Sequence, residues 1–398
     1  MLMIISIVAL SILAWNILGP LLPLYLASIQ ITPQLIGLIL SAAMVGMVIG
    51  ESTGGWMADK IGIRTPLIAG TFISGLSVLC FAFTQNIAAL FTIFFFWGLF
   101  RSAVFGPVRG YIGVNAPVLR KATFMAFISV VQSASTSIGA LSSGFLADNL
   151  GFRAIFFVSC GISATAGILV LYGLRKVKSP QYNTSTIAPP SDGINTSTIA
   201  RTNYRPFIVQ CVVAALQFWG WGATMSFLAL FANQVIGASA TRVGILFTAS
   251  SISGMVLSIP MAMIADRLGR KNSMLLGMAV SAISAAGIAF SPAYSWLLFF
   301  VILGGLGAAA FTPAALGMVS DIVPANWQGT AMGFYGAFGE NIGVIAGSSL
   351  SGFIWSAWGP SNTFLVTSGV IGSGIIVCAV LIKAKGAKGE PKTLPAKL

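Results

Sequence analysis

The stretch Gly55-Trp56-Met57-Ala58-Asp59-Lys60-Ile61-Gly62-Ile63-Arg64 returns later in the chain as Ala262-Met263-Ile264-Ala265-Asp266-Arg267-Leu268-Gly269-Arg270-Lys271. The second copy begins 207 residues after the first, and each copy joins two long apolar segments. A turn with so many charges is expensive to place near lipid unless those charges are satisfied, so its presence twice indicates one structural role performed twice. The repeat therefore predicts two related halves.

The composition places both halves in a bilayer. Hydrophobic residues make up 57% of the 398 residues, charged residues only 7%, and the mean hydropathy is +0.93, which excludes an ordinary soluble globular protein. Segments of about 20 apolar residues, the length that crosses a membrane as a helix, recur twelve times. The alternating pattern of a membrane barrel is absent from the sequence. We expect an all-α membrane protein with twelve transmembrane helices in two pseudo-symmetric halves of six. The expected spans are 4–28, 35–57, 66–84, 87–113, 122–146, 154–173, 207–232, 243–264, 273–290, 295–320, 329–355 and 362–382.

The net charge is +13, and the lysines and arginines behind it are unevenly divided between the loops on the two sides of the membrane. If the N-terminus is cytoplasmic, the inner loops and the tail hold seventeen lysines and arginines, and the outer loops hold only Arg153 and Arg242. This asymmetry follows the positive-inside rule and predicts a multi-pass protein of the cell membrane with both termini in the cytoplasm. The charge orients the chain in the bilayer, so no nucleic-acid partner is expected.

Metal and cofactor chemistry has little support in the sequence. Cys80, Cys160, Cys211 and Cys378 lie singly in apolar spans, and the chain has no histidine. A zinc site, a haem site and a disulfide framework are therefore not expected. Motifs of hydrolases, metalloproteases and nucleotide-binding loops are also absent from the sequence, so we expect neither an enzyme nor a bound cofactor.

Two further matches fix the organisation of the chain. Gly106-Pro107 corresponds to Thr312-Pro313, and the interval from Gly144 to Gly151 corresponds to that from Gly352 to Gly359, at offsets of 206 and 208. A polar stretch rich in Pro, Ser, Thr and Asn separates the two copies. We expect a first six-helix half at 1–173, a cytoplasmic linker at 174–206, a second six-helix half at 207–383 and a basic cytoplasmic tail at 384–398.

These features resemble the major facilitator superfamily over the whole chain, and loosely its 12-span drug/proton antiporter branch. The loop signature G-x-x-x-D-[RK]-x-G-x-[RK] is present between spans 2 and 3, and a degenerate copy lies between spans 8 and 9. The resemblance implies that these loops form a conformational latch between the halves. The alternative is that the charges of each turn only set the orientation of the chain in the membrane. The latch residues so implied are Gly55, Asp59, Gly62, Arg64, Asp266, Arg267, Gly269 and Lys271, with Asp321 completing the network. Two antiporter marks are weakened: Phe94 stands where that branch carries an arginine, and Gly139–Gly144 lacks the usual proline.

Four charges lie within the expected spans: Glu51, Arg101, Arg109 and Glu340. Each must face protein or water. A rise of about 1.5 Å per helical residue places Glu51 at the same depth in the membrane as Arg109. Glu51 reaches Arg101 only if the arginine side chain bends toward it. Glu51 and its arginine partner therefore form either a structural ion pair or part of a substrate site. Glu340 has no basic residue in its own span and lies near the midplane. It is either a proton carrier or a neutral, hydrogen-bonded side chain that packs.

The resemblance further implies that spans 1, 4, 7 and 10 line a central cavity. The candidate cavity residues are Trp15, Asn16, Tyr25, Gln217, Trp219, Trp221 and Phe311, with Arg101 among the charges. Such a lining is aromatic and mostly neutral, although tryptophan and tyrosine also populate the membrane interfaces. We expect a monomeric secondary transporter that uses the proton gradient to export small amphipathic or hydrophobic solutes. The alternatives are an uptake symporter or facilitator for a sugar or an organic anion, and a non-transporting membrane sensor in a transporter fold.

Overall fold

A computed structural model describes residues 2–104, 107–108, 121–173, 204–323 and 328–382. At some helical positions, Asp59 and Asp266 among them, the description covers the backbone and not the side chain. Arg109, the linker at 174–203 and the tail from 383 lie outside the described residues. Throughout the described ranges the chain is built from helices.

Most described helices follow the expected spans closely, but the expected span 87–113 is wrong in length, because α5 ends at Ser102 and a turn follows at 103–104. The first half contains α1 (Leu2–Leu18), α2 (Leu22–Ser28), α3 (Pro33–Ile61), α4 (Arg64–Phe81), α5 (Ile87–Ser102), α7 (Lys121–Leu150) and α8 (Phe152–Gly173). The second half contains α10 (Arg205–Gln234), α11 (Ala240–Leu268), α12 (Arg270–Ala289), α13 (Tyr294–Ile322), α14 (Gln328–Phe334), the π-helical segment η4 (Tyr335–Asn341), α15 (Ile342–Trp358) and α16 (Pro360–Leu381). Nine of the helices in the described chain are long and apolar enough to cross a membrane. The expected all-α membrane architecture is confirmed.

Local sequence signals explain where several helices begin and bend. Asn86 caps α5 by accepting hydrogen bonds from the backbone N–H groups of Ala88 and Ala89. The Gly19-Pro20 pair converts the first span into α1, a short 3₁₀ segment (Gly19–Leu21) and α2. In contrast, Pro260 and Pro313 lie inside the continuous helices α11 and α13. The proline-induced break is therefore confined to the first span among these positions.

The two copies of the repeated loop end their preceding helices in the same way. Gly62 follows α3 with φ of 88°, and Gly269 follows α11 with φ of 85°. Residues that carry a Cβ atom rarely adopt a backbone conformation with such a positive φ angle, which explains the glycine in both copies. We call the end of the bundle that carries these two loops the loop end, and the opposite end the far end.

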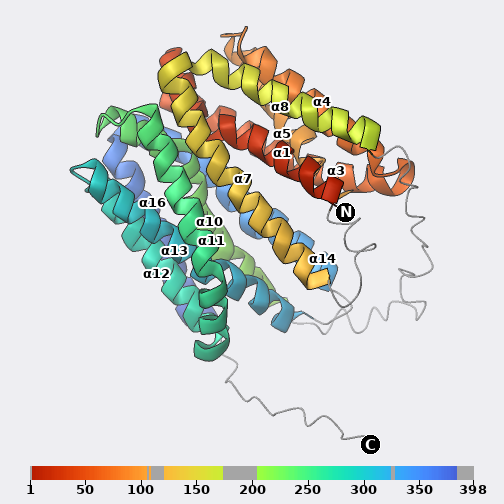
Figure 1. Ribbon diagram of the computed structural model, residues 1–398. Helices are drawn as coiled ribbons and strands as arrows, with labels where there is room; N and C mark the ends of the chain where they lie inside the picture. The colour runs from red at the N-terminus through yellow and green to blue at the C-terminus, as the bar shows by residue number, and fades with distance from the viewer. Residues whose placement is uncertain (1, 105–106, 109–120, 174–203, 324–327, 383–398) are drawn as a thin grey trace, which may run out of the picture.

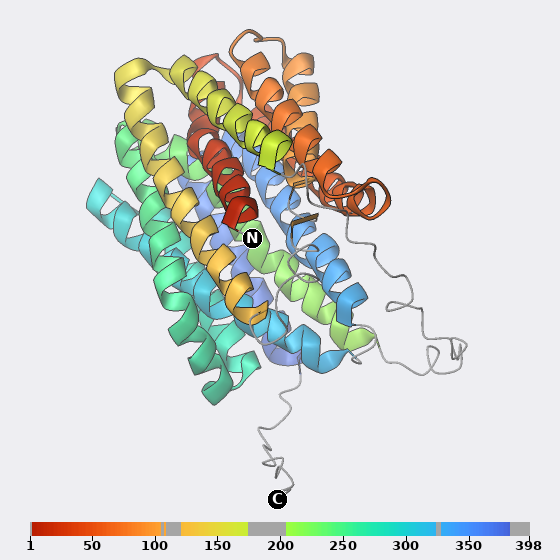
Figure 2. The same cartoon turned by 45° about the vertical axis from the view of Figure 1, so that its right-hand side comes forward.

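The helices form two groups that meet along two contacts. The helices of the first half, red to yellow in Figure 1, lie beside those of the second half, green to blue. Across the boundary α7 packs along α11, and α3 packs along α15. Figure 2 shows the same two groups after a turn of 45°. Close backbone approach at glycine defines both contacts: a Cβ on Gly144 would meet Ala240, and a Cβ on Gly352 would meet Pro33.

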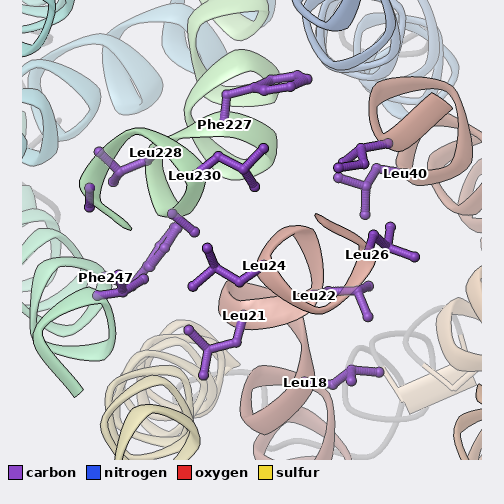
Figure 3. Close-up of a cluster of buried hydrophobic side chains, with 14 of the residues drawn as sticks. Leu18, Leu21, Leu22, Leu24, Leu26, Leu40, Phe227, Leu228, Leu230 and Phe247 are labelled. Carbon is purple, nitrogen blue, oxygen red and sulfur yellow. The ribbon is translucent and has the colours of Figure 1, made fainter. Parts of the chain in front are cut away.

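The apolar core is divided unevenly between the two ends. The largest group of buried side chains, here the far-end cluster, takes residues from both halves; its members include Leu21, Leu26, Ile36, Phe227, Phe231 and Val243. Figure 3 shows Leu24 of the first half among Leu228, Leu230 and Phe247 of the second. At the loop end the described core is two separate clusters. One is built from first-half residues such as Ile7 and Leu67, the other from second-half residues such as Met274 and Phe311.

Candidate functional site

The basic residues of the two repeated loops make matching contacts. Arg64, at the start of α4, donates from Nη2 to the carbonyl oxygen of Leu171 near the end of α8, at 3.1 Å. Lys271, at the start of α12, donates from Nζ to the carbonyl oxygen of Ala379 near the end of α16, at 2.7 Å. The last carbonyls of a helix lack partners within the helix and carry partial negative charge, so a cation is favourable there. The first contact therefore ties α4 to α8, and the second ties α12 to α16.

The remaining latch candidates lie close to these contacts. Arg270 forms an ion pair with Asp321 of α13, with 2.7 Å between Nη1 and Oδ2. Gly55 has open space where a side chain would stand, and Arg267 is exposed. The side chains of Asp59 and Asp266, expected to pair with the neighbouring basic residues, lie outside the described part of the structure. The contacts of Arg64, Lys271 and Arg270 each join two residues of the same half.

At the far end, a carboxylate joins the two halves. Asp148, two residues beyond the expected span 122–146, accepts hydrogen bonds from the backbone N–H groups of Ala240 (3.0 Å) and Thr241 (2.8 Å) at the start of α11. Burial alone would raise the pKa of this carboxyl. The hydrogen bonds from Thr241, Ser239 and Ala240 outweigh that effect and hold its pKa below the ordinary value of 3.8. Asp148 was not expected as a site residue; the sequence signal for it is an acidic residue just beyond the end of an expected span.

Hydroxyl groups support the same boundary between the halves. Thr248 of α11 donates to the carbonyl oxygen of Ser137 on α7 at 3.0 Å. Ser41 of α3 donates to the carbonyl oxygen of Ile345 on α15 at 3.2 Å, and Ser348 donates to that of Gly37 at 3.3 Å. Together with Asp148, these contacts fasten the halves to each other in the far half of the bundle.

The charged residues of the expected spans differ in burial. Arg101 is 6% exposed inside the first half, with its guanidinium against the rings of Trp15 and Trp97. Glu51 is exposed on α3, and Arg109, its expected partner, lies outside the described residues. Glu340 is half-buried in the π-helical segment η4, beside the buried Tyr335 of the same segment. Single π-helical turns inside α-helices occur frequently at functional sites.

The expected cavity residues do not gather into one cluster. Asn16 donates to Thr136 of α7 at 3.2 Å, and Tyr25 packs at the far end with its hydroxyl donating to the carbonyl oxygen of Phe81 at 2.9 Å. Gln217 donates to Ser281 at 2.9 Å, and Phe311 is fully buried in the second-half cluster. On α10, Trp221 is 40% exposed, and Trp219 is half-buried with its Nε1 atom buried.

Comparison with known proteins agrees with this architecture. The sequence model described as Major Facilitator Superfamily matches residues 4–208 and 210–397. The chain belongs to the Major Facilitator Superfamily. It is a transporter and not an enzyme, a multi-pass membrane protein with a small solute as its substrate, and its fold is that of the superfamily.

Individual relatives are distant. An uncharacterized MFS-type transporter of Methanocaldococcus jannaschii is 22% identical over 358 residues, covering 89% of this chain and 90% of the relative. Multidrug resistance protein 2 of Bacillus subtilis is 19% identical over 346 residues, covering 87% and 86%. Among solved structures, the nucleoside transporter NupG superposes with a TM-score of 0.79 at 16% identity, covering 96% of this chain and 99% of that one. The structural likeness concerns the fold alone.

Proposed function

We propose that this transporter works by alternating access and that the structure corresponds to the state open at the loop end. The division of the apolar core carries this proposal: the far-end cluster is shared by both halves, whereas each half has its own cluster at the loop end. Two bodies that share a core at one end and have separate cores at the other are arranged to rock about the shared end. The latch loops, whose described contacts stay within one half, fit this state.

The orientation of this state follows from charge. The loop end carries Lys60, Arg64, Arg267, Arg270 and Lys271, and cytoplasmic loops carry the excess of basic residues. We therefore propose that the loop end faces the cytoplasm, with both termini on that side. The halves are assigned to 1–173 and 207–383, and the functional unit is a monomer in the cell membrane.

Within this mechanism we favour proton-linked export of amphipathic or hydrophobic compounds. Two observations support export of such solutes over uptake of an organic anion. Arg101 lies inside the first half, so it is withdrawn from a boundary between the halves, while Trp219 and Trp221 offer aromatic surface on α10. A relative named for multidrug resistance covers most of the chain. The proton gradient is the proposed energy source, and Glu340 is the proposed carrier.

Transport by purified protein in liposomes tests the substrate class. An imposed pH gradient is applied, and internal pH is followed while lipophilic cations, neutral sugars and organic acids are added separately. Proton movement that depends on a lipophilic cation supports the proposal. Proton movement that depends only on a sugar or an organic acid replaces it with the uptake alternative. Solute flux without any proton movement rejects the proton coupling.

The role of Glu340 has its own test. We expect Glu340→Gln to abolish accumulation driven by a pH gradient while solute exchange across the membrane continues, because an amide can form hydrogen bonds but cannot take up and release a proton. Glu51→Gln, which removes the exposed carboxyl of α3, is the matched control and should retain accumulation. Full accumulation by Glu340→Gln would remove Glu340 from the coupling mechanism, and loss in the control alone would transfer the role to Glu51.

A further inference from the structure

A small cavity lies inside the first half, away from the boundary with the second. Its volume is about 20 Å³, and it is lined by Ser11 of α1, Thr71 and Ser74 of α4, Arg101 and Val104 at the end of α5, and Ser163 of α8. A cavity needs about 10–15 Å³ to hold one water molecule, so this cavity has room for one water molecule or one small ion. All of its lining belongs to one half, which separates it from any solute path between the halves.

Arg101 brings an incompletely paired charge to this cavity. One nitrogen, Nη1, lies 3.3 Å from the sulfur of Met47, and the guanidinium lies against the ring of Trp15 and 5.3 Å from the ring centroid of Trp97. The other two nitrogens, Nε and Nη2, are buried and have no hydrogen-bond partner within the described residues. A guanidinium cannot lose its proton in a protein, so it cannot escape the cost of burial by becoming neutral.

The second half shows what a neutral version of this site looks like. By the repeat offsets, Ser11 corresponds to Gln217, Ser74 to Ser281 and Arg101 to Gly307. In the second half Gln217 donates directly to Ser281 at 2.9 Å, and a Cβ on Gly307 would strike the Ser281 hydroxyl. The equivalent space is thus filled by a neutral pair. The charge and the cavity are properties of the first half and not requirements of the helical arrangement.

We infer that this cavity binds one small monovalent anion of the size of chloride, which neutralises Arg101. Nε and Nη2 supply two charge-assisted donors, which are stronger than neutral ones. The hydroxyls of Ser11, Thr71 and Ser74 donate to carbonyl oxygens of their own helices. Because hydroxyl groups rotate, these donors can turn toward an anion. The rings of Trp15 and Trp97 offset part of the charge of Arg101. A water molecule would satisfy the hydrogen bonds, but only an anion supplies a full opposite charge, so the electrostatics favour an anion.

Thermal unfolding of the purified full-length protein in detergent tests this site. The wild type is titrated with sodium chloride or sodium bromide at constant ionic strength, with sodium gluconate as the balancing salt because gluconate is too large for the cavity. We expect a saturable halide-dependent stabilisation. Arg101→Met should weaken the apparent halide affinity by at least about tenfold, corresponding to loss of one hydrogen bond to a charged group. Arg267→Met, an exposed arginine at the loop end, should leave it unchanged.

A second variant keeps the test decisive if Arg101→Met does not fold. Ser163→Leu fills the cavity from α8 and leaves Arg101 in place, and radioactive chloride binding is measured directly at equilibrium. One chloride per wild-type chain and none per Ser163→Leu chain would support the site. Stabilisation without saturation, equal binding in wild type and Ser163→Leu, or no chloride bound to the wild type would each overturn it, and the last result would assign the cavity to water.

Discussion

Arg64 and Lys271 stand at matching positions of the two loop copies, and each donates a hydrogen bond to a carbonyl near the end of the last helix of its half, α8 or α16. We expect Arg64→Met and Lys271→Met each to lower the free energy of unfolding by about 1 kcal/mol. Because the two contacts lie in different halves, the effects should add in the double variant. Denaturation of purified protein gives the comparison, with exposed Arg267→Met as the control.

An unaltered double variant would show that these cations act only in the other conformational state. In that case their importance would appear in transport rate and not in stability. The two results therefore distinguish a role within each half from a latch between the halves.

Asp148 is the other side chain whose role follows from its own contacts. Removing a carboxylate that accepts the first backbone N–H groups of a neighbouring helix costs about 1 kcal/mol, so Asp148→Ala should shift the ratio of far-end-open to far-end-closed molecules by about fivefold. Spin labels at Leu150 and Val235, both exposed at the far end, report this shift as a longer distance. Asn149→Ala is the control, because Asn149 donates to Phe145 in its own helix.

The same contact has a defined pH dependence. The pKa of Asp148 is lower in the folded protein, so its stabilising contribution is fully present above the ordinary value of 3.8 and is lost as the pH falls through the lowered value. The label distance should therefore stay constant between about pH 5 and 8 and lengthen only in stronger acid. Lengthening near neutral pH would mean that another group controls the far end.

At the scale of elements, the crossing of α7 and α11 depends on the absence of a side chain. A Cβ on Gly144 would meet the backbone of Ala240 and Thr241. Gly144→Leu should destabilise the far-end-closed state by about 1–3 kcal/mol through overpacking. Gly161→Leu, on the open face of α8, is the matched control, because nothing lies within 4 Å of its added Cβ. Equal label distances in the two variants would contradict tight packing at this crossing.

The elements were also the part of the structure that the sequence predicted best. The expected spans 35–57 and 243–264 correspond to the helices α3 (Pro33–Ile61) and α11 (Ala240–Leu268), which are longer at both ends. Hydropathy marks only the stretch inside the hydrocarbon, whereas the helix continues until a glycine or a capping residue ends it. The contacts of Asp148 were not predictable in this way, because its partners are backbone groups 92 and 93 residues away. Arg101 was found from the rarity of buried charge, but its aromatic and hydroxyl neighbours came only from the packing of helices.

For the whole molecule, alternating access requires the far end to open. In a background without the four native cysteines, cysteines at Ser137 and Thr248 lie across the α7–α11 boundary, where the Thr248 hydroxyl is 3.0 Å from the Ser137 carbonyl oxygen. Oxidation should join the halves and abolish transport, and reduction should restore it. Cysteines at Ser133 and Ser137, both on α7, provide the control. Undiminished transport after complete cross-linking would exclude opening at this boundary.

The shared apolar cluster at the far end gives temperature a part in the proposed cycle. Opening that end exposes Leu24, Leu230 and Phe247 to water, and closing the loop end covers apolar surface there. The free energy gained by burying apolar surface shrinks as temperature falls. If the closed far end covers more apolar surface than the closed loop end, cooling shifts the population toward molecules with the far end open, with no change in solute or proton gradient.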